Sequence, residues 1–199
     1  MNEEEKQSVR QMPTVEQLSE ELRREKYRRR YRRLFRSTVY TLVIVAAVSV
    51  LIATLLLPVL QIYGTSMTPN LGDGDIVVSV KSNRVEQGDI IAFYYNNRVL
   101  VKRVIAQGGD TVNIDSDGNV YVNDQLLEEP YLTPEQKNRG SSDLEYPYTV
   151  PANTYFVLGD HRETSVDSRS SLLGCVEHSE IIGKIEFRVW PIKKLGKVF

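Results

Sequence analysis

One serine and one lysine in this chain could together activate a nucleophile. Ser66 lies in the string GTSMTP (residues 64–69), and Lys102 lies in the string VKRV (residues 101–104). A serine hydroxyl is a weak nucleophile until a base removes its proton. A lysine amine can be that base once burial lowers its pKa by about three units from roughly 10.4, because it is then largely neutral near pH 7–8. The two residues therefore predict a nucleophile and its base.

Strand alternation indicates where this amine points. Residues 98–106 read as a strand in which Leu100, Lys102 and Val104 share one face. Two apolar neighbours on that face predict that Lys102 points inward. The alternative is a lysine whose stem covers a half-buried strand while its amine reaches water, which is common for lysine. The spacing alone leaves both interpretations open.

A histidine base is the weaker alternative. The chain has two histidines, and Asp160 directly precedes His161. The string around Ser66 departs from the G-x-S-x-G nucleophile elbow at Thr68, and the strand-then-helix setting of that elbow is missing. Pro69 likewise excludes the S-x-x-K spacing of penicillin-binding enzymes. A Ser-His-Asp triad is therefore disfavoured.

Cysteine and histidine content argues against metal chemistry. Cys175 is the only cysteine, His161 and His178 are the only histidines, and no cluster has metal-ligand spacing. We therefore predict no metal site and no cofactor. A single cysteine also excludes an intramolecular disulfide, and Cys175 is interpreted as a small buried apolar residue.

A long apolar segment precedes Ser66. No charged residue occurs between Ser37 and Gly72, and Val39–Leu60 is 22 mostly aliphatic residues. A helix needs about 20 such residues to cross the hydrocarbon of a bilayer, whereas a cleaved signal peptide has an apolar region of about 7–15. The sequence predicts an uncleaved transmembrane anchor at residues 37–60, with Pro58 near its outer end, where a helix can stop.

Charge sets the predicted orientation. Residues 1–36 hold eleven Lys/Arg and seven Glu, and nine of those cations lie between Arg23 and Arg36. Such clusters beside a membrane span stay in the cytoplasm, an interpretation we prefer to nucleic-acid binding. Residues 1–36 are thus expected in the cytoplasm, with a helix starting at the Thr14–Gln17 capping box, and residues 61–199 outside the cell membrane.

The remainder of the chain reads as antiparallel β-structure. Residues 124–150 are polar and proline-containing, and about 111–150 is expected to be a small insertion in the outer domain. The fold class predicted is an all-β domain preceded by one transmembrane helix. The expected strands, which alternate or flank turn residues, are 75–81, 89–95, 98–106, 111–114, 120–122, 154–158 and 181–190.

Four motifs in order resemble type I signal peptidase, which cuts signal peptides from exported preproteins. The resemblance covers the anchor and nearly all of residues 60–190, and the single anchor is similar to the Gram-positive branch. The motifs are Ser66-Met67-x-Pro69, then Gly74-Asp75-Ile76-Val77, then Lys102-Arg103-Val104-Ile105 followed by Gly109-Asp110, then Gly159-Asp160-His161-Arg162 with Ser165, Asp167, Ser168 and Arg169.

The resemblance implies a role for each matching residue. Ser66 would be the nucleophile, Lys102 the general base, and Ser165 the hydroxyl that orients the lysine. The backbone N–H of Ser66 would donate to the oxyanion. Cleavage would follow small residues in an Ala-x-Ala pattern. The implied partners are preproteins with signal peptides and the lipid bilayer, with contact to the secretion machinery left open and no nucleic acid. The residues implied to brace the site are Asp160, Asp167 and Arg169.

Three positions depart from the family pattern. Gly64 stands where some members have a serine whose hydroxyl is the second oxyanion donor, so another donor would have to substitute. Residues 106–108 (AQG) replace the usual Gly-x-Pro, which suggests a looser turn. His161 stands where asparagine is usual, either as a loop residue without a catalytic part or as a source of pH dependence.

Distance along the chain places Ser66 near the membrane. Six residues separate Leu60 from Ser66, which span at most about 20 Å. Met67, Leu71 and Phe93 could dip into the lipid interface, although core packing is the preferred interpretation for the last two. Two other functions are compatible with parts of this sequence: a self-cleaving regulator with the same Ser-Lys pair, and a sorting or adhesion module on a stalk.

Overall fold

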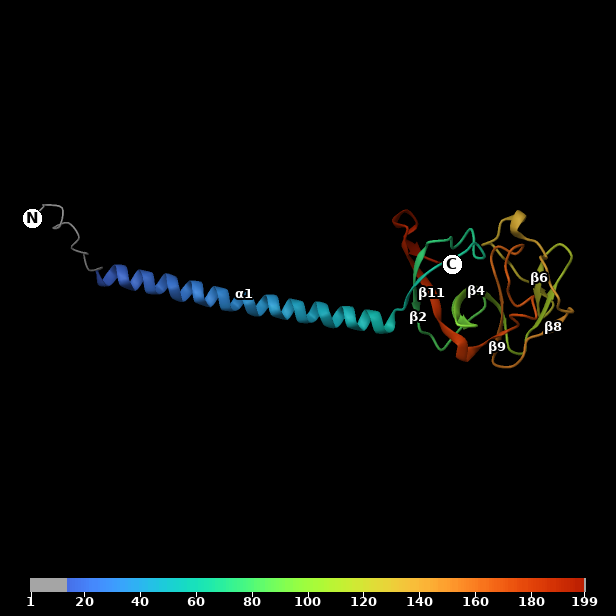
Figure 1. Ribbon diagram of the computed structural model, residues 1–199, viewed down its shortest axis with the longest axis horizontal. Helices are drawn as coiled ribbons and strands as arrows, with labels where there is room; N and C mark the ends of the chain where they lie inside the picture. The colour runs from blue at the N-terminus through green and yellow to red at the C-terminus, as the bar shows by residue number, and fades with distance from the viewer. Residues whose placement is uncertain (1–13, 199) are drawn as a thin grey trace, which may run out of the picture. The chain divides into compact units, whose positions relative to one another are not determined.

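The computed structural model describes residues 14–198, apart from the side chains of residues 54–56. The chain divides into two units, Met1–Ile52 and Ala53–Phe199. The first unit contains most of helix α1 (Val15–Leu56), coloured blue to green in Figure 1. The second unit contains all of the strands. The site residues predicted from the sequence all belong to this second unit.

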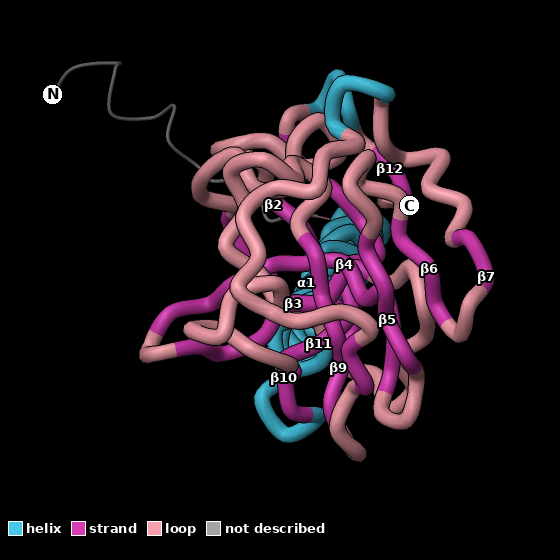
Figure 2. Tube along the Cα trace, turned by 90° about the vertical axis from the view of Figure 1, so that its right-hand side faces the viewer, coloured by secondary structure: helices cyan, strands magenta, loops and turns pink. Residues whose placement is uncertain are grey.

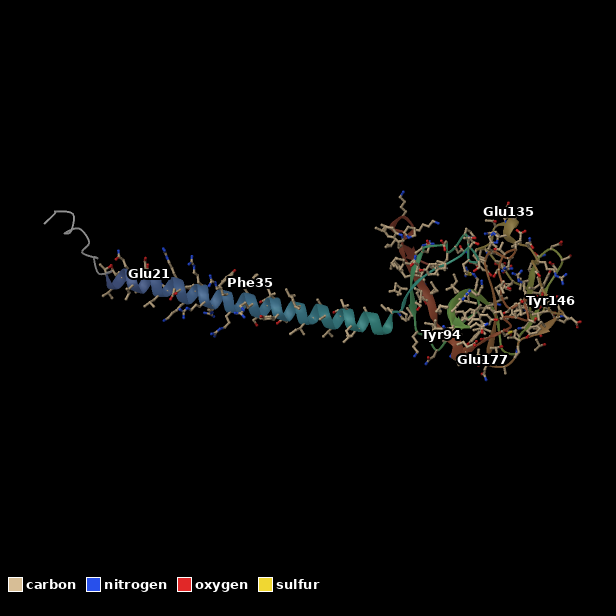
Figure 3. The ribbon with its side chains drawn as sticks, in the orientation of Figure 1. Glu21, Phe35, Tyr94, Glu135, Tyr146 and Glu177 are labelled. Carbon is tan, nitrogen blue, oxygen red and sulfur yellow. The ribbon has the colours of Figure 1, made fainter. Side chains whose placement is uncertain are left out.

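Helix α1 begins at the predicted capping box. Thr14 Oγ1 accepts from the backbone N–H of Gln17 at 3.4 Å, and Gln17 Oε1 accepts from the N–H of Thr14 at 3.2 Å. The helix then continues through the basic segment and the apolar run as one element, of which Val15–Ala53 includes a segment long and apolar enough to cross a membrane. Its described side chains are exposed, as at Glu21 and Phe35 in Figure 3.

The helix ends four residues before the predicted end at Leu60. Pro58 lacks a backbone N–H, and its ring disfavours helical geometry at the residue before it. The chain turns instead into strand β1 (Val59–Gln61), which pairs antiparallel with β2 (Ile76–Val80). Val59 and Leu60 are therefore part of a sheet rather than of the anchor helix.

Two antiparallel sheets make up the second unit, which confirms the predicted fold class. The larger has the order β1-β2-β11-β3-β4-β9-β10, with β12 paired to β11; the smaller has the order β7-β6-β5-β8. Figure 2 shows β5 and β6 side by side in the smaller sheet. The remaining bounds are β3 Ile90–Tyr95, β4 Arg98–Gln107, β5 Thr111–Ile114, β6 Val120–Val122, β7 Gln125–Leu126, β8 Tyr148–Thr149, β9 Thr154–Leu158, β10 Val176–Glu177, β11 Ile181–Trp190 and β12 Gly196–Lys197.

The smaller sheet is built entirely from residues within the predicted insertion at 111–150. One apolar cluster joins it to the larger sheet, with Ile105 and Phe156 from the larger sheet and Val112 and Val120 from the smaller. All four side chains are buried. Burial of such side chains contributes about 1.5–3 kcal/mol each, so this cluster holds the two sheets together.

A second apolar cluster anchors the turn that carries Ser66. Met67 and Leu71 are 1% and 0% exposed, and they pack with Val77, Ile90 and other residues of the larger sheet. Met67 is therefore a core residue, and the expectation that it dips into the lipid interface is wrong. Core packing is confirmed for Leu71 and for Phe93.

Candidate active site

Ser66 lies in a compact turn between β1 and β2. The N–H of Leu71 donates to the Met67 carbonyl at 2.8 Å, which closes one turn of chain directly after Ser66. Gly64 precedes it with φ +88°, a conformation that glycine adopts without strain. Its N–H donates to Asp73 Oδ1 at 2.8 Å. Both sides of the turn are thus held, which fixes the backbone that carries the half-buried Ser66.

Lys102 lies in β4, between β3 and β9. Only 4% of Lys102 is exposed, and its Nζ donates to Ser165 Oγ at 3.0 Å. The inward direction predicted from alternation is confirmed. Burial lowers the pKa of the Lys102 amine from 10.5 to about 8, with Asp167 and Asp160 acting against this shift and Arg169 adding to it. A neutral amine is therefore accessible near neutral pH.

Gly159 brings Ser66 and Ser165 together. A Cβ at this position would lie 2.2 Å from Ser165 Oγ and 2.6 Å from the Ser66 carbonyl oxygen, so no side chain fits between them. The N–H of His161 also donates to the Ser66 carbonyl at 3.0 Å. Ser66, Ser165 and Lys102 thus surround one point of the fold.

Ser66 and Lys102 are near each other without a direct hydrogen bond. Among the hydrogen bonds of residues 14–198, Lys102 Nζ contacts Ser165 Oγ and none joins it to Ser66 Oγ. Catalytic hydrogen bonds are often long in free enzymes and shorten when substrate binds. The arrangement could serve a base and a nucleophile, because the buried Lys102 amine and the Ser66 backbone both lie beside Ser165.

Asp160 forms a buried ion pair with Arg103, the neighbour of Lys102 in β4. Arg103 Nε and Nη2 donate to the two carboxylate oxygens at 2.9 and 2.8 Å, and both side chains are at most 2% exposed. Arg103 also donates to the Gly88 carbonyl at 2.8 Å. Arg103 lies in the motif that begins at Lys102, but no role was predicted for it from the sequence.

Asp167 and Arg169 hold the loop that carries Ser165. Arg169 Nε and Nη2 donate to the two Asp167 oxygens at 2.7 and 2.8 Å. Asp167 also accepts from the N–H of Gly159 at 3.0 Å, and Arg169 donates to the Arg162 carbonyl at 2.7 Å. The structure therefore brings all seven sequence-predicted site residues to one region, with Gly64 at its edge.

Three further residues that the sequence did not predict contact the charged side chains of this site. The buried Glu129 forms an ion pair with Arg162, and the Tyr131 ring covers the Arg103 guanidinium with 3.8 Å between its centroid and Cζ. Asn70 donates to Asp160 Oδ2 at 2.7 Å. These contacts join residues 28 to 90 positions apart in the chain, and no local pattern signals them.

The two histidines have separate surroundings. His161 Nδ1 contacts Thr164 Oγ1 at 2.9 Å, and the backbone of His161 contacts Ser66. His178 Nδ1 contacts the Tyr155 hydroxyl at 3.0 Å. Cys175 is half-buried beside the apolar cluster between the sheets, and burial raises the pKa of its thiol. Within residues 14–198, no three His, Cys, Asp or Glu side chains form a group that could hold a metal ion.

Comparison with known proteins identifies the family. The family model described as "Signal peptidase, peptidase S26" matches residues 35–190. The chain belongs to this signal peptidase family. "Signal peptidase IB" of Staphylococcus aureus (strain COL) is 35% identical over 156 residues, which cover 69% of this chain and 80% of that protein. "Signal peptidase I" of Streptococcus pneumoniae serotype 4 is 32% identical over 173 residues, covering 68% and 83%.

A solved structure is also similar. The crystal structure of a signal peptidase I from Enterococcus faecalis V583 is 33% identical, with a TM-score of 0.42, and the match covers 51% of this chain and 97% of that chain. As a member of the signal peptidase family, the chain is a serine endopeptidase of the type I signal peptidase class that removes signal peptides from preproteins. This assignment replaces the interpretations as a self-cleaving regulator or an adhesion module.

Proposed function

We propose that Ser66 is the nucleophile of this signal peptidase and that Lys102 is its general base. The observation that carries the proposal is the state of the lysine: its amine is buried, has a hydroxyl as its hydrogen-bond partner, and has a pKa lowered to about 8. At pH 7.5 such an amine is neutral in roughly a quarter of the molecules. An exposed lysine would be neutral in far fewer.

The proton follows a short path in this proposal. The neutral Lys102 amine takes the proton of Ser66 as Oγ forms a bond to the scissile carbonyl carbon. The oxyanion that develops accepts a hydrogen bond from the backbone N–H of Ser66. When the C–N bond breaks, the Lys102 ammonium gives its proton to the leaving amine. Water then hydrolyses the Ser66 ester, with Lys102 again acting as base.

Gly64 has a conformational role in this proposal rather than a chemical one. It offers no hydroxyl, and its backbone N–H is already bonded to Asp73. Its φ of +88° instead sets the direction of the chain that enters the Ser66 turn. The second oxyanion donor that some relatives draw from a serine at this position is therefore not supplied by residue 64.

The supporting residues divide by what they touch. Ser165 contacts the Lys102 amine and orients it. Asp167 and Arg169 hold the loop on both sides of Ser165, and Asp160 neutralises Arg103 beside the lysine. We assign these residues to the position and electrostatics of the dyad.

The proposal includes a membrane setting. Residues 1–36 would lie in the cytoplasm, the apolar part of α1 would cross the cell membrane, and the β domain would lie outside. A preprotein whose apolar segment lies in the same bilayer would present its Ala-x-Ala site near Ser66. Sharing one plane raises the effective concentration of enzyme and substrate without new contacts.

The test is cleavage of a preprotein by the full-length enzyme in lipid vesicles. Ser66→Ala and Lys102→Ala should each abolish cleavage, while Ser116→Ala and Lys81→Ala, at exposed positions, should cleave normally. The rate at low substrate should rise with pH through about 8, because the amine must lose its proton first. Near-normal turnover by either dyad variant, or a rate that is flat from pH 5 upward, would reject the proposal.

A further inference from the structure

A segment that follows the strands of the smaller sheet returns to the turn that carries Ser66. This segment, residues 129–136, follows β7 and contacts the turn at two places. Asn70 Nδ2 donates to the Tyr131 carbonyl at 3.1 Å, and Gln136 Nε2 donates to the Thr68 carbonyl at 3.0 Å. Thr68 and Asn70 lie two and four residues after Ser66. The contacts therefore reach the backbone next to the nucleophile.

Gln136 is held at both ends of its amide. Its Oε1 accepts from the N–H of Thr133 at 2.9 Å, at the start of the 3-10 turn Pro134–Gln136. Its Nε2 then faces the Thr68 carbonyl. The neighbouring Glu135 is exposed, and Figure 3 shows it pointing away from the domain. This short turn thus presents one oriented donor to the Ser66 turn.

Asn70 joins the same segment to the ion-paired core. Its amide nitrogen donates to Asp160 Oδ2 as well as to the Tyr131 carbonyl. The Tyr131 ring covers Arg103, and its hydroxyl donates to Glu129 Oε1 at 2.8 Å. Burial raises the pKa of Tyr131, so that hydroxyl remains a donor. The chain directly after Ser66 is therefore tied at Thr68 and Asn70 to groups that are themselves held.

We propose that residues 129–136 are a positioning element for Ser66, and that Gln136 of this element and Asn70 of the Ser66 turn are the positioning residues that join the two. This inference rests on the proposed role of Ser66 as nucleophile. Neither residue contacts the reacting atoms; both set the backbone that carries them. Displacement of a reacting group by about 1 Å can lower a rate by about 10²-fold, so small movements of this turn matter.

The most selective test is Gln136→Glu in the full-length enzyme. The carboxylate keeps the acceptor for Thr133 but places an oxygen against the Thr68 carbonyl. We expect kcat to fall about tenfold, the effect of one lost hydrogen bond, with KM unchanged. The pH at which the rate rises should stay the same, because the Lys102–Ser165 contact is untouched. The matched control is Gln125→Glu, the same change at an exposed position of β7, which should leave kcat normal.

Asn70→Ala is the second variant. This variant loses the amide contacts to the Tyr131 carbonyl and to Asp160, and it should lower kcat by more than Gln136→Glu does. Thermal unfolding of each variant is measured alongside kcat. Normal kcat in both variants, or a loss confined to KM or to the melting temperature, would overturn the inference. If Ser66→Ala still cleaves, the proposed function itself fails. If Ser66→Ala is inactive while both positioning variants cleave normally, only the positioning role fails.

Discussion

Lys102 and Arg103 are neighbours in β4, and their cationic groups have opposite surroundings. Both side chains are almost fully buried, at 4% and 2% exposed. Arg103 donates to the two oxygens of Asp160, whereas the Lys102 amine, among residues 14–198, has only the hydroxyl of Ser165 as its hydrogen-bond partner. Burial is thus the same for the two cations, and the partner differs. A paired cation keeps its charge, and a cation opposite a hydroxyl gives up its proton more readily.

The other buried arginines of the site are also paired with carboxylates, as Arg103 is. Arg162 pairs with Glu129 and Arg169 pairs with Asp167. Within the described chain, each of these three arginines has a carboxylate, and Lys102 has none within ion-pair distance. Arginine stays charged in any protein environment and binds carboxylates with two parallel hydrogen bonds. The comparison shows that the three arginines brace the site through carboxylates, and the unpaired state of the Lys102 amine supports its proposed role in proton transfer.

Replacing Lys102 with arginine should have the largest effect, because it removes the difference between the two neighbouring cations. Lys102→Arg keeps a cation in place but cannot deprotonate near neutral pH. We expect the cleavage rate to fall by about 10²–10⁴-fold, the usual contribution of a general base. Single-turnover cleavage of a preprotein measures the loss. Lys81→Arg, an exposed change of the same kind, is the control, and a rate for Lys102→Arg close to that of this control would contradict the role of the lysine.

Removing a carboxylate tests the other half of the comparison. Asp160→Ala leaves the Arg103 guanidinium buried without its carboxylate, which should lower the free energy of unfolding by about 3–5 kcal/mol. Urea denaturation measures this change. The control is Glu86→Ala, which removes an exposed pair with Arg84 and should change stability by at most about 1 kcal/mol. Equal effects of the two substitutions would show that burial does not distinguish these ion pairs.

Lys102→Met tests the lowered pKa of the Lys102 amine through the pH dependence of stability. The folded pKa of Lys102 is about 8 against 10.5 for the free group, so the native state binds fewer protons between these values. Wild-type stability should therefore rise across that window. Below pH 8 the buried ammonium costs about 3 kcal/mol, so Lys102→Met should be more stable than wild type by about that amount at pH 7 and by progressively less toward pH 10.

Lys184 is the opposite control for that experiment. Its hydrogen bond to Asp89 raises the pKa of the Lys184 amine. Its contribution to stability is therefore present below its ordinary pKa and is lost only at higher pH. Lys184→Met should lower stability at pH 7. Unfolding curves from pH 6 to 10 measure both variants, and a pH-independent difference for Lys102→Met would contradict a lowered pKa.

The sequence alone determined the larger elements and the identity of the dyad candidates. All seven predicted strands are present, because alternating β-branched and aromatic residues bounded by turn residues are a local signal. The start of α1 at Thr14 was likewise predicted from four neighbouring residues. Ser66 and Lys102 were found from residue type, burial pattern and motif order.

Tertiary structure decided what depends on distant partners. Strands β1, β7, β8, β10 and β12 have only two or three residues each, too few for a period, and form by pairing with longer neighbours. The partners of Arg103 and Arg162 come from 57 and 33 residues away. The contacts of residues 129–136 with the Ser66 turn join residues 61 and 68 positions apart. The pKa of Lys102 belongs to the same class, because desolvation depends on which atoms pack around the amine and not on its neighbours in sequence.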